Sequence, residues 1–427
     1  MSWSSSTGGE KRTVNLRQMR EAGSETRIKA MNDSPRPNFG FEITHRDKGS
    51  RARCGHLRTP HGSIETPNFI FCATKGAMKS VSLQQMREAG AEIILSNTYH
   101  LLLRPGGEIV QRLGGLHRLM DWQGPLLTDS GGFQIFSLGH GGVAREIKSH
   151  RPFENDYPKT LIRVEEEGAV FRSYVDGKRL RLTPELAMET QRQLGADLVL
   201  VLDECTPFHV EKAETEASME RSHRWEERSL GAFRAHDDGR QALYGILQGG
   251  VYEDLRARSG AYVAGRPFFG QAIGGSLGKT VEQMHDVVAM TSRYLHPERP
   301  THLLGISGIR DIWNGVACGV DTFDCVHPTR VARHGIAFVP PSLAEGRGFL
   351  NLKNGRFRQD GNPVDADCPC YGCRSFTRSY LHYLFHAREL LGGQLLTIHN
   401  VAFMVRLMRQ IRQSIREGRF AEARREW

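Results

Sequence analysis

Three aspartates each follow a short apolar run of the chain, and they carry the clearest chemical signal in the sequence. They are Asp129 after residues 125–128, Asp203 after residues 198–202 and Asp324 after residues 320–323. An aspartate in such a place is most simply the cap of a following helix, and this holds for Asp324 taken alone. Carboxylates at several run ends are harder to explain as caps, so we interpret them as members of one site.

Other run ends carry groups that suit a flat ligand. They are Gln248 after residues 243–247, Gly274-Gly275 after residues 268–273 and Gly305 after residues 301–304. Asp203 and Gln248 offer an acceptor and a donor–acceptor pair, which fit the edge of a guanine-like base. Glycines let backbone N–H groups approach the ligand, and Phe133 offers a face for stacking. Asp129 and Asp324 remain as the equipment for breaking a glycosidic bond through a covalent sugar–enzyme intermediate.

The strongest local signal is a cysteine cluster, Cys368-x-Cys370-x-x-Cys373. Three thiolates and one imidazole make a closed structural zinc site with no open position for catalysis. Three candidates for the imidazole follow the cluster, and spacing alone does not choose among them: His382, His386 and His399. The other five cysteines are scattered, which is not the pattern of a secreted disulfide framework, so we expect a reducing cytosol.

Composition sets the broad class. The 427 residues are 39% hydrophobic and 25% charged, which is typical of a soluble globular protein with one large domain or two ordinary ones. No apolar run reaches the roughly 18 residues of a membrane span, and no secretory signal is present. The net charge of +9 favours a polyanionic partner such as nucleic acid, although simple solubility explains it equally well.

The elements that must gather these residues are alternating strands and helices. The predicted strands are residues 69–72, 92–96, 125–128, 198–202, 243–247, 268–273, 301–304 and 320–323. Helical patterns between them include residues 81–89, 184–194 and 281–294. This order predicts an α/β fold, a parallel (β/α)8 barrel of the TIM type. The carboxyl ends of its strands would meet at one mouth, where the run-end residues collect.

We expect residues 37–340 to form this barrel. The gap between the third and fourth runs is too long for one crossover, so residues 134–182 should hold an inserted hairpin. Its two strands are predicted at residues 160–165 and 169–175, and the Gly-rich residues 139–142 are expected to be a flexible lid.

The two ends of the chain read differently. Residues 1–36 are polar and should be a disordered tail. After Asp324 we expect a polar and basic loop, with Pro328 ending the strand. Residues 341–427 should form a helical zinc-binding subdomain, and residues 400–427 an amphipathic helix whose arginines make a solvated face.

Several motifs together resemble one family. They are Thr128-Asp-Ser-Gly-Gly-Phe-Gln134, Asp203-Glu-Cys-Thr-Pro207, Phe323-Asp-Cys-Val, Pro328-Thr-Arg330 and the cysteine cluster. In this order they resemble the bacterial type of tRNA-guanine transglycosylases (queuine tRNA-ribosyltransferases). The likeness runs from about Phe41 to beyond His399, so it covers nearly everything but the tail.

The resemblance implies the role of each motif. Asp324 would be the nucleophile that attacks C1′ of the wobble guanosine in a G-U-N anticodon, and Asp129 the general acid and base. The implied base contacts are Asp129, Ser130, Gly131, Gly132, Phe133, Asp203, Gln248, Gly274 and Gly275. The implied tRNA contacts are Gly305, Ile306, Ser307, Gly308, Ile309, Arg310, Asp311, Thr329, Arg330, Val331, Ala332 and Arg333. The implied ligands of one structural Zn²⁺ per subunit are Cys368, Cys370, Cys373 and His399.

The same resemblance implies the reaction and the partners. Guanine would be exchanged for a 7-deazaguanine by double displacement in queuosine biosynthesis, in a cytoplasmic homodimer without ATP or redox cofactor. The loop Ser276-Leu277-Gly278-Lys279 is one residue shorter than in the family, which favours the bulky base queuine. Cys205 is typical of the bacterial type that takes the smaller preQ1, so both bases stay open.

Three other interpretations fit less well. The catalytically silent RNA-binding partner subunit of eukaryotic relatives should lack the aspartates that are present here. The archaeal relative has a long C-terminal RNA-binding extension, whereas 28 residues follow His399 in this chain. An unrelated zinc hydrolase would need an open metal position near the strand ends.

Overall fold

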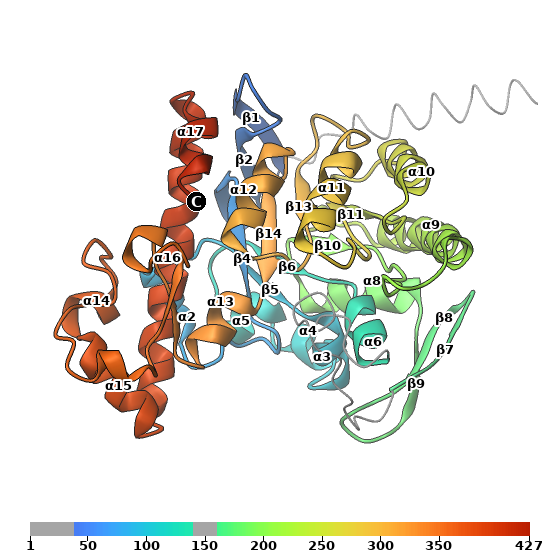
Figure 1. Cartoon of the computed structure of the whole chain (residues 1–427). Coiled ribbons are helices and arrows are strands. Elements are labelled where there is room, and N and C mark those ends of the chain that lie inside the picture. The colour runs from blue at the N-terminus through green and yellow to red at the C-terminus, as the bar shows by residue number, and fades with distance from the viewer. Residues whose placement is uncertain (1–37, 140–159) are drawn as a thin grey trace, which may run out of the picture. The chain divides into compact units, whose positions relative to one another are not determined.

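The computed structural model describes residues 38–139 and 160–427. The expected tail, residues 1–36, and most of the expected lid, residues 140–142, lie outside these ranges. The C-terminal end of the chain lies beside the strands β1 and β2 (Figure 1).

Eight parallel strands close into a barrel in chain order, with the last strand hydrogen-bonded to the first. They are β4 (Asn68–Cys72), β5 (Ile94–Ser96), β6 (Leu126–Thr128), β10 (Leu198–Leu200), β11 (Ala242–Leu247), β12 (Gly270–Ile273), β13 (Thr301–Leu303) and β14 (Thr322–Cys325). All six residues of β11 are buried. Burial on both faces explains why these strands read as continuous apolar runs in the sequence. The predicted barrel is confirmed, with strand bounds shifted by up to two residues.

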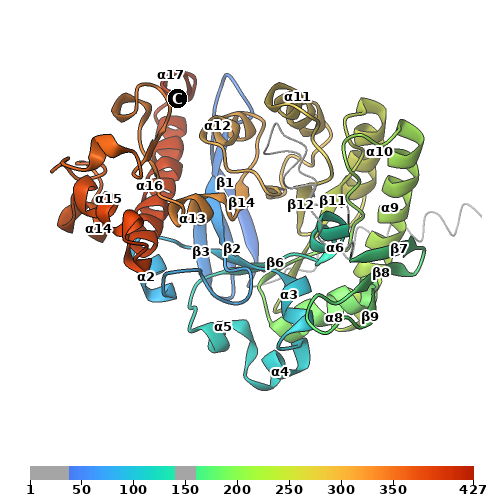
Figure 2. The same ribbon diagram turned by 60° about the horizontal axis from the view of Figure 1, so that its bottom comes forward.

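Helices connect the strands around the outside of the barrel (Figures 1 and 2). They are α2 (Leu83–Glu88), α3 (Thr98–Leu103), α4 (Gly107–Arg112), α5 (Gly115–Met120), α8 (Pro184–Leu194), α9 (Lys212–Ala235), α10 (Glu253–Ala264), α11 (Val281–Ser292), α12 (Ile309–Ala317) and α13 (His327–Ala332). Local signals set their ends. Thr183 caps α8 by accepting from the Leu186 N–H, and Gly195 ends it in the left-handed region.

The insertion between β6 and β10 begins with the helix α6 (Gly132–Gly139) and ends in a three-stranded antiparallel sheet. The predicted hairpin is present as β7 (Leu161–Glu165) and β8 (Gly168–Arg172). The third strand, β9 (Arg179–Leu182), was not predicted. The indole of Trp225 on α9 donates to the Glu166 carbonyl at 2.8 Å, which fastens the sheet to the barrel helices.

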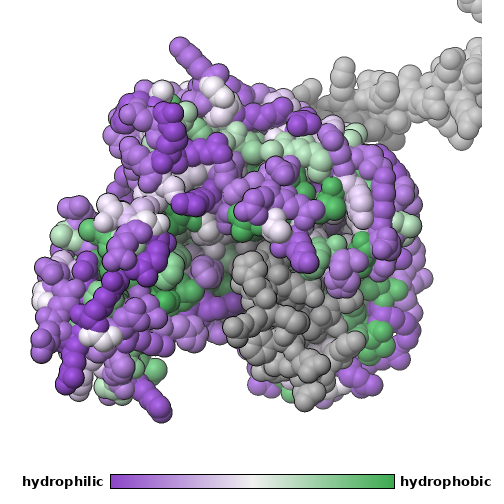
Figure 3. All heavy atoms as spheres, in the orientation of Figure 1, coloured by the Kyte–Doolittle hydropathy of each residue, from purple (hydrophilic) through white to green (hydrophobic). Residues whose placement is uncertain are grey.

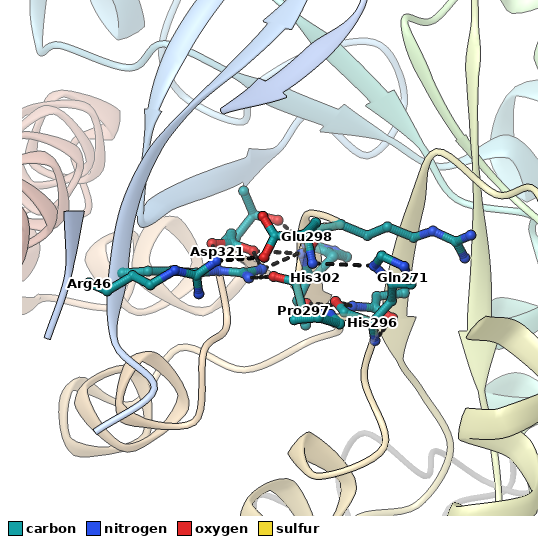
Figure 4. A network of polar contacts seen from close by, with 11 residues as sticks. Arg46, Gln271, His296, Pro297, Glu298, His302 and Asp321 are labelled. Atoms are coloured by element: carbon teal, nitrogen blue, oxygen red, sulfur yellow. Dashed lines mark hydrogen bonds and ion pairs between the residues drawn. The ribbon is translucent and has the colours of Figure 1, made fainter. Parts of the chain in front are cut away.

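A second antiparallel sheet precedes the barrel and was also not predicted. It consists of β1 (Gly40–Arg46), β2 (Arg53–Thr59) and β3 (Gly62–Thr66). Arg53 joins it to the start of β14, because its guanidinium contacts both carboxylate oxygens of Asp321 at 2.9 and 2.6 Å. Figure 4 shows the surrounding network, in which the Asp321 carboxylate also accepts from the Thr301 N–H at 2.7 Å. This buried ion pair therefore fixes the sheet against the amino-terminal ends of β13 and β14.

The C-terminal region combines a small sheet with helices. It contains β15 (Ile336–Phe338), η1 (Pro341–Leu343), β16 (Phe349–Asn351), η2 (Gly355–Phe357), α14 (Tyr371–Ser375), α15 (Arg378–His386), α16 (Leu390–Arg416) and α17 (Phe420–Arg425). α16 packs against β1, β2, β4 and α13. It is long and apolar enough to span a membrane, but 72% of its most apolar window is buried inside the protein, as in a core helix.

Two expectations about this region were wrong. The last long helix begins at Leu390, ten residues before the predicted start, and a break separates it from α17. Its arginines do not all lie on a solvated face. Arg412 is buried and donates to the Pro67 carbonyl at 2.8 Å, so this arginine joins α16 to the strand that begins the barrel.

Candidate active site and metal site

The polar residues at the strand ends lie together at one mouth of the barrel. Asp129 directly follows β6, Asp203 follows β10, Gln248 follows β11, and Asp324 lies in β14. Asp129 interacts electrostatically with both Asp324 and Asp203, so the three carboxylates share one site. In Figure 3 the face shown is hollowed, with hydrophobic residues along the hollow and hydrophilic residues covering most of the remaining surface.

Asp324 does not cap a helix. β14 continues through it to Cys325, and the next residues form the helix α13 where a loop was expected. Pro328 stands in the first turn of α13, a position where its missing N–H costs nothing. The Asp324 carboxylate instead accepts from the Gly305 N–H, at 2.9 Å from Oδ1.

Two further groups surround this carboxylate. His302 Nε2 lies 3.3 Å from Oδ1, and the Cys72 thiol lies 3.5 Å from Oδ2. Burial acts to raise the pKa of Asp324, but His302, the Gly305 N–H and Cys72 outweigh it and hold the pKa below its ordinary value. Asp324 is therefore ionised at neutral pH, as a carboxylate nucleophile must be.

The pKa of Asp129 is shifted in the opposite direction, upward. Its carboxylate accepts from the Asn97 amide, from the Thr98 N–H at 2.8 Å and from the Gln134 amide at 2.7 Å. Burial raises the pKa of Asp129 to about 6 although these hydrogen bonds act in the other direction. A carboxyl group that titrates near neutral pH can both give and take a proton during a reaction.

Asp203 and Gln248 form a pair. The Gln248 amide donates to Asp203 Oδ2 at 2.5 Å, and burial raises the pKa of Asp203 to about 7 against this bond. Gly275 adopts φ +75°, and a Cβ at this position would collide with the Gln248 carboxamide oxygen. Only glycine fits both the conformation and the close approach, so the two strand-end segments interlock here.

Four further predicted base contacts, residues 130–133, lie just before and at the start of α6, and the last one, Gly274, directly follows β12. Gly131 has φ +86°, and a Cβ there would come within 3.1 Å of the Tyr99 nitrogen. Ser130 accepts from the Gly132 N–H at 3.3 Å, and both residues are buried. The Phe133 ring is 42% exposed, which is unusual for a large apolar side chain and leaves a face open for stacking.

The predicted tRNA contacts divide into exposed and buried residues. Exposed ones are Gly305, Gly308, Arg310 and Arg330, and partly exposed ones are Ile309, Asp311, Val331 and Arg333. Ile306, Ser307, Thr329 and Ala332 are buried. Arg310 donates to the Trp427 carbonyl at 2.9 Å, so its side chain is already engaged by the C-terminus. Among the three arginines predicted to contact tRNA, Arg330 is therefore the one most open to a phosphate.

Four buried side chains could hold a metal ion, with their ligand atoms all within 4.8 Å of one another: Cys368, Cys370, Cys373 and His399. His399 Nδ1 faces the thiolates at 3.2 Å from Cys373 Sγ, while Nε2 lies 2.7 Å from the Phe338 carbonyl. This carbonyl fixes the tautomer and the ring orientation that a metal needs. Neither His382 nor His386 belongs to this group of ligand atoms, so His399 is the histidine that the fold brings to the three cysteines. The set fits a closed tetrahedral site for a thiolate-seeking ion such as Zn²⁺.

A second group with metal-ligating side chains consists of His61, His117 and Asp197. The two imidazole rings are stacked, with centroids 3.6 Å apart and planes 13° from parallel. Parallel rings point their lone pairs alongside each other and not at one ion. Asp197 also accepts from the Leu126 N–H at 2.8 Å, so the group is better explained as a hydrogen-bonded cluster.

Comparison with known proteins agrees with this arrangement. The sequence profile of the queuine tRNA-ribosyltransferases matches residues 47–427. The chain belongs to this family. Proteins with that name are 50% identical in Roseiflexus sp. (strain RS-1) over 91% of this chain and 99% of the relative, and 42% identical in Protochlamydia amoebophila over 89% and 96%. A queuine tRNA-ribosyltransferase of Synechococcus elongatus is 43% identical over 91% of this chain and 94% of the relative.

Membership makes the chain a tRNA-guanine transglycosylase, an enzyme of the family whose general activity is exchange of guanine in tRNA. Sequence reasoning missed several residues that contact the two carboxylates, among them Asn97 and His302. Asn97 follows β5 directly, so the rule used for the other strand ends would have found it. His302 lies inside β13, and no sequence signal shows that its ring faces Asp324.

Proposed function

We propose that this member of the queuine tRNA-ribosyltransferase family replaces the wobble guanine of G-U-N anticodons with a 7-deazaguanine by double displacement. One observation carries the proposal. A single mouth holds one carboxyl group with a lowered pKa, Asp324, and one with a pKa raised to about 6, Asp129. Two carboxyl groups with opposite tendencies are the usual basis for dividing nucleophile and acid–base roles.

In this mechanism an Asp324 oxygen forms a bond to C1′ of the guanosine while the bond from C1′ to the base nitrogen breaks. The electron pair of that bond leaves with guanine, which takes up the proton of Asp129. Asp129 then removes a proton from the incoming base, and the base nitrogen attacks C1′ and releases Asp324. Each proton and electron pair is returned, so the exchange consumes no oxidant and no ATP.

Recognition of the base falls to the interlocked segments. Ionised Asp203 would accept from the N–H groups at the edge of guanine. Gln248 and the Gly275 backbone would form the other hydrogen bonds to this edge. Phe133 would stack on the ring. The target base must leave its stack to enter the mouth, which costs least in a single-stranded loop and so supports an anticodon loop as substrate.

The choice between preQ1 and queuine depends on the loop after Gly275. Within this loop Ser276 and Leu277 are buried, and Gly278 adopts φ +106°. We propose that this shortened loop admits queuine, whereas the buried Cys205 supports the preQ1 type. Competition of guanine, preQ1 and queuine for one tRNA decides between the two bases. Absence of queuine exchange would overturn the proposal that the loop admits queuine.

The zinc site would hold residues 341–427 as a subdomain, since it has four protein ligands and no open position. Exposed apolar residues on this part, such as Tyr383 at 61% and Leu390 at 87%, support a homodimer contact there. All eight cysteines are free, which supports a reducing, cytoplasmic compartment. Light scattering of the chain and of a Leu390→Asp variant tests the dimer.

The test of function is incorporation of radiolabelled guanine into a tRNA with a G-U-N anticodon. Asp324→Ala should abolish both incorporation and the denaturant-stable tRNA–protein adduct. Asp129→Ala should abolish turnover while tRNA binding remains. Asp286→Ala, at an exposed position of α11, is the control and should leave both signals unchanged. An active Asp324→Ala variant would overturn the assignment, and tRNA binding without exchange in the unaltered chain would favour a silent RNA-binding subunit.

A further inference from the structure

Arg256 is a charged residue in a place where charge is costly. It lies on α10, and its side chain is fully buried. No carboxylate pairs with it within residues 38–139 and 160–427. Burial lowers the pKa of Arg256 to about 10, which still leaves the guanidinium charged at neutral pH. A buried, unpaired arginine of this kind requires an explanation beyond filling space.

The donors of this guanidinium all reach backbone carbonyls. Nε donates to Gly250 at 2.8 Å, Nη1 to Leu247 at 3.1 Å and to Gly274 at 2.9 Å, and Nη2 to Ser276 at 3.1 Å. Two of these carbonyls belong to the segment around Gln248 after β11, and two to the segment after β12. One side chain therefore joins the two segments that carry the proposed base contacts.

These bonds also fix which way the neighbouring N–H groups point. In a trans peptide the N–H lies opposite the carbonyl of the preceding residue. A guanidinium on the Gly274 carbonyl thus turns the Gly275 N–H away from Arg256. A charge-assisted bond to a carbonyl also polarises its peptide and makes the N–H a stronger donor. The same holds at Leu247, where the Gln248 N–H on the opposite side donates to Ser259 Oγ at 2.9 Å.

We propose that Arg256 is a positioning residue that sets the affinity of the site for its purine base. It holds residues 247–250 and 274–276 in the arrangement that presents Gln248 and the Gly275 N–H. A planar guanidinium is needed because four carbonyls in two segments must be reached from one side chain, which a lysine ammonium cannot do. This inference rests on the proposed function for the identity of the base.

A role in base binding differs from a purely structural role in what it changes. Loss of positioning should raise the KM and the Kd for guanine while the KM for tRNA stays the same, because tRNA also binds through its loop and phosphates. A purely structural role would lower the melting temperature and kcat without this split. The two roles therefore separate in one set of measurements.

The experiment compares Arg256→Lys with Arg258→Lys on the same helix. Arg258 is 48% exposed and forms ion pairs with Glu216 and Glu220, so it is a matched control. Calorimetry measures guanine binding, and exchange assays measure KM for each substrate. We expect Arg256→Lys to weaken guanine binding about tenfold or more, as for the loss of one to two charge-assisted hydrogen bonds. The KM of Arg256→Lys for tRNA should stay within about twofold of the unaltered chain. The Kd for guanine and the KM for tRNA of Arg258→Lys should do the same.

Arg256→Gln serves as a second variant if the lysine variant does not fold. A folded variant of either kind with unchanged guanine binding would overturn the proposal. Failure of both variants to fold would also overturn it and make Arg256 a residue of the fold. If the unaltered chain binds guanine but does not exchange it into tRNA, the proposed function fails and the binding comparison still tests Arg256.

Discussion

Binding of guanine should weaken as the pH falls through 7, because of Asp203. This carboxylate must be ionised to accept hydrogen bonds from the N–H groups of the base edge. Burial raises the pKa of Asp203 to about 7 even though the Gln248 amide favours the ionised form. The protonated form therefore predominates below pH 7 and the ionised form above it. Protonated Asp203 presents a donor where the base also has donors, so it cannot take the base in the same way.

The size of the effect follows from the pKa. If only the ionised form binds, the apparent Kd is multiplied by one plus the ratio of protonated to ionised Asp203. With a pKa of about 7 this factor is about 11 at pH 6, about 2 at pH 7 and about 1.1 at pH 8. The Kd for guanine should thus be about tenfold larger at pH 6 than at pH 8. Below pH 7 binding should also release a proton, which makes the heat depend on the buffer.

Calorimetry of the free enzyme with guanine measures both quantities without the chemical step. Asp203→Asn is the control, since an amide does not titrate and its weaker binding should not change between pH 6 and 8. A constant Kd in the unaltered chain would refute the reasoning. A slope that persists in Asp203→Asn would assign the titration to another group, of which Asp129 is the nearest candidate.

Three further outcomes follow from the contacts described. Gly275→Ala should raise the KM for the base about tenfold or more, as measured by exchange kinetics, because its Cβ would collide with Gln248 and its φ is +75°. Asp321→Asn should lower the free energy of unfolding in urea by about 3–5 kcal/mol, since it leaves the Arg53 guanidinium buried without its partner. Cys373→Ser should reduce the bound metal from about one ion per chain to nearly none by elemental analysis, and lower the melting temperature, whereas Cys318→Ser should retain the metal.

The barrel could be predicted because its strands are short, apolar and separated by regular helical stretches. The missing strands lack that signal. β1 has only partly buried or exposed residues, and the four residues of β9 alternate arginine with leucine. The early start of α16 was missed because Gly392 and Gly393 argue against a helix. A Cβ on Gly392 would lie only 3.1 Å from the Leu384 Cβ on α15, so glycine serves close packing there, and tertiary contact overrides helix propensity.

The site was predictable only where chemistry and position coincide. Aspartates and glutamine directly after apolar runs could be assigned to one mouth, because parallel strands end at the same side. Arg256 could not. It and Arg258 stand two positions apart on α10, about 200° apart around the helix. One therefore enters the core while the other meets solvent, and nothing in the local sequence decides which.

The surroundings of Asp324 also distinguish its two oxygens. Oδ1 receives the Gly305 N–H at 2.9 Å and faces His302 at 3.3 Å, whereas Oδ2 has the weak thiol donor of Cys72 at 3.5 Å. Hydrogen bonds withdraw electron density from the oxygen that accepts them, so Oδ2 is the better nucleophile and we expect it to attack C1′. Cys72→Ala removes this weak donor and should leave the rate of adduct formation within about twofold. A loss of more than about tenfold in a folded Cys72→Ala variant would mean that the thiol orients the attacking oxygen, and the assignment of Oδ2 as the less restrained oxygen would then be wrong.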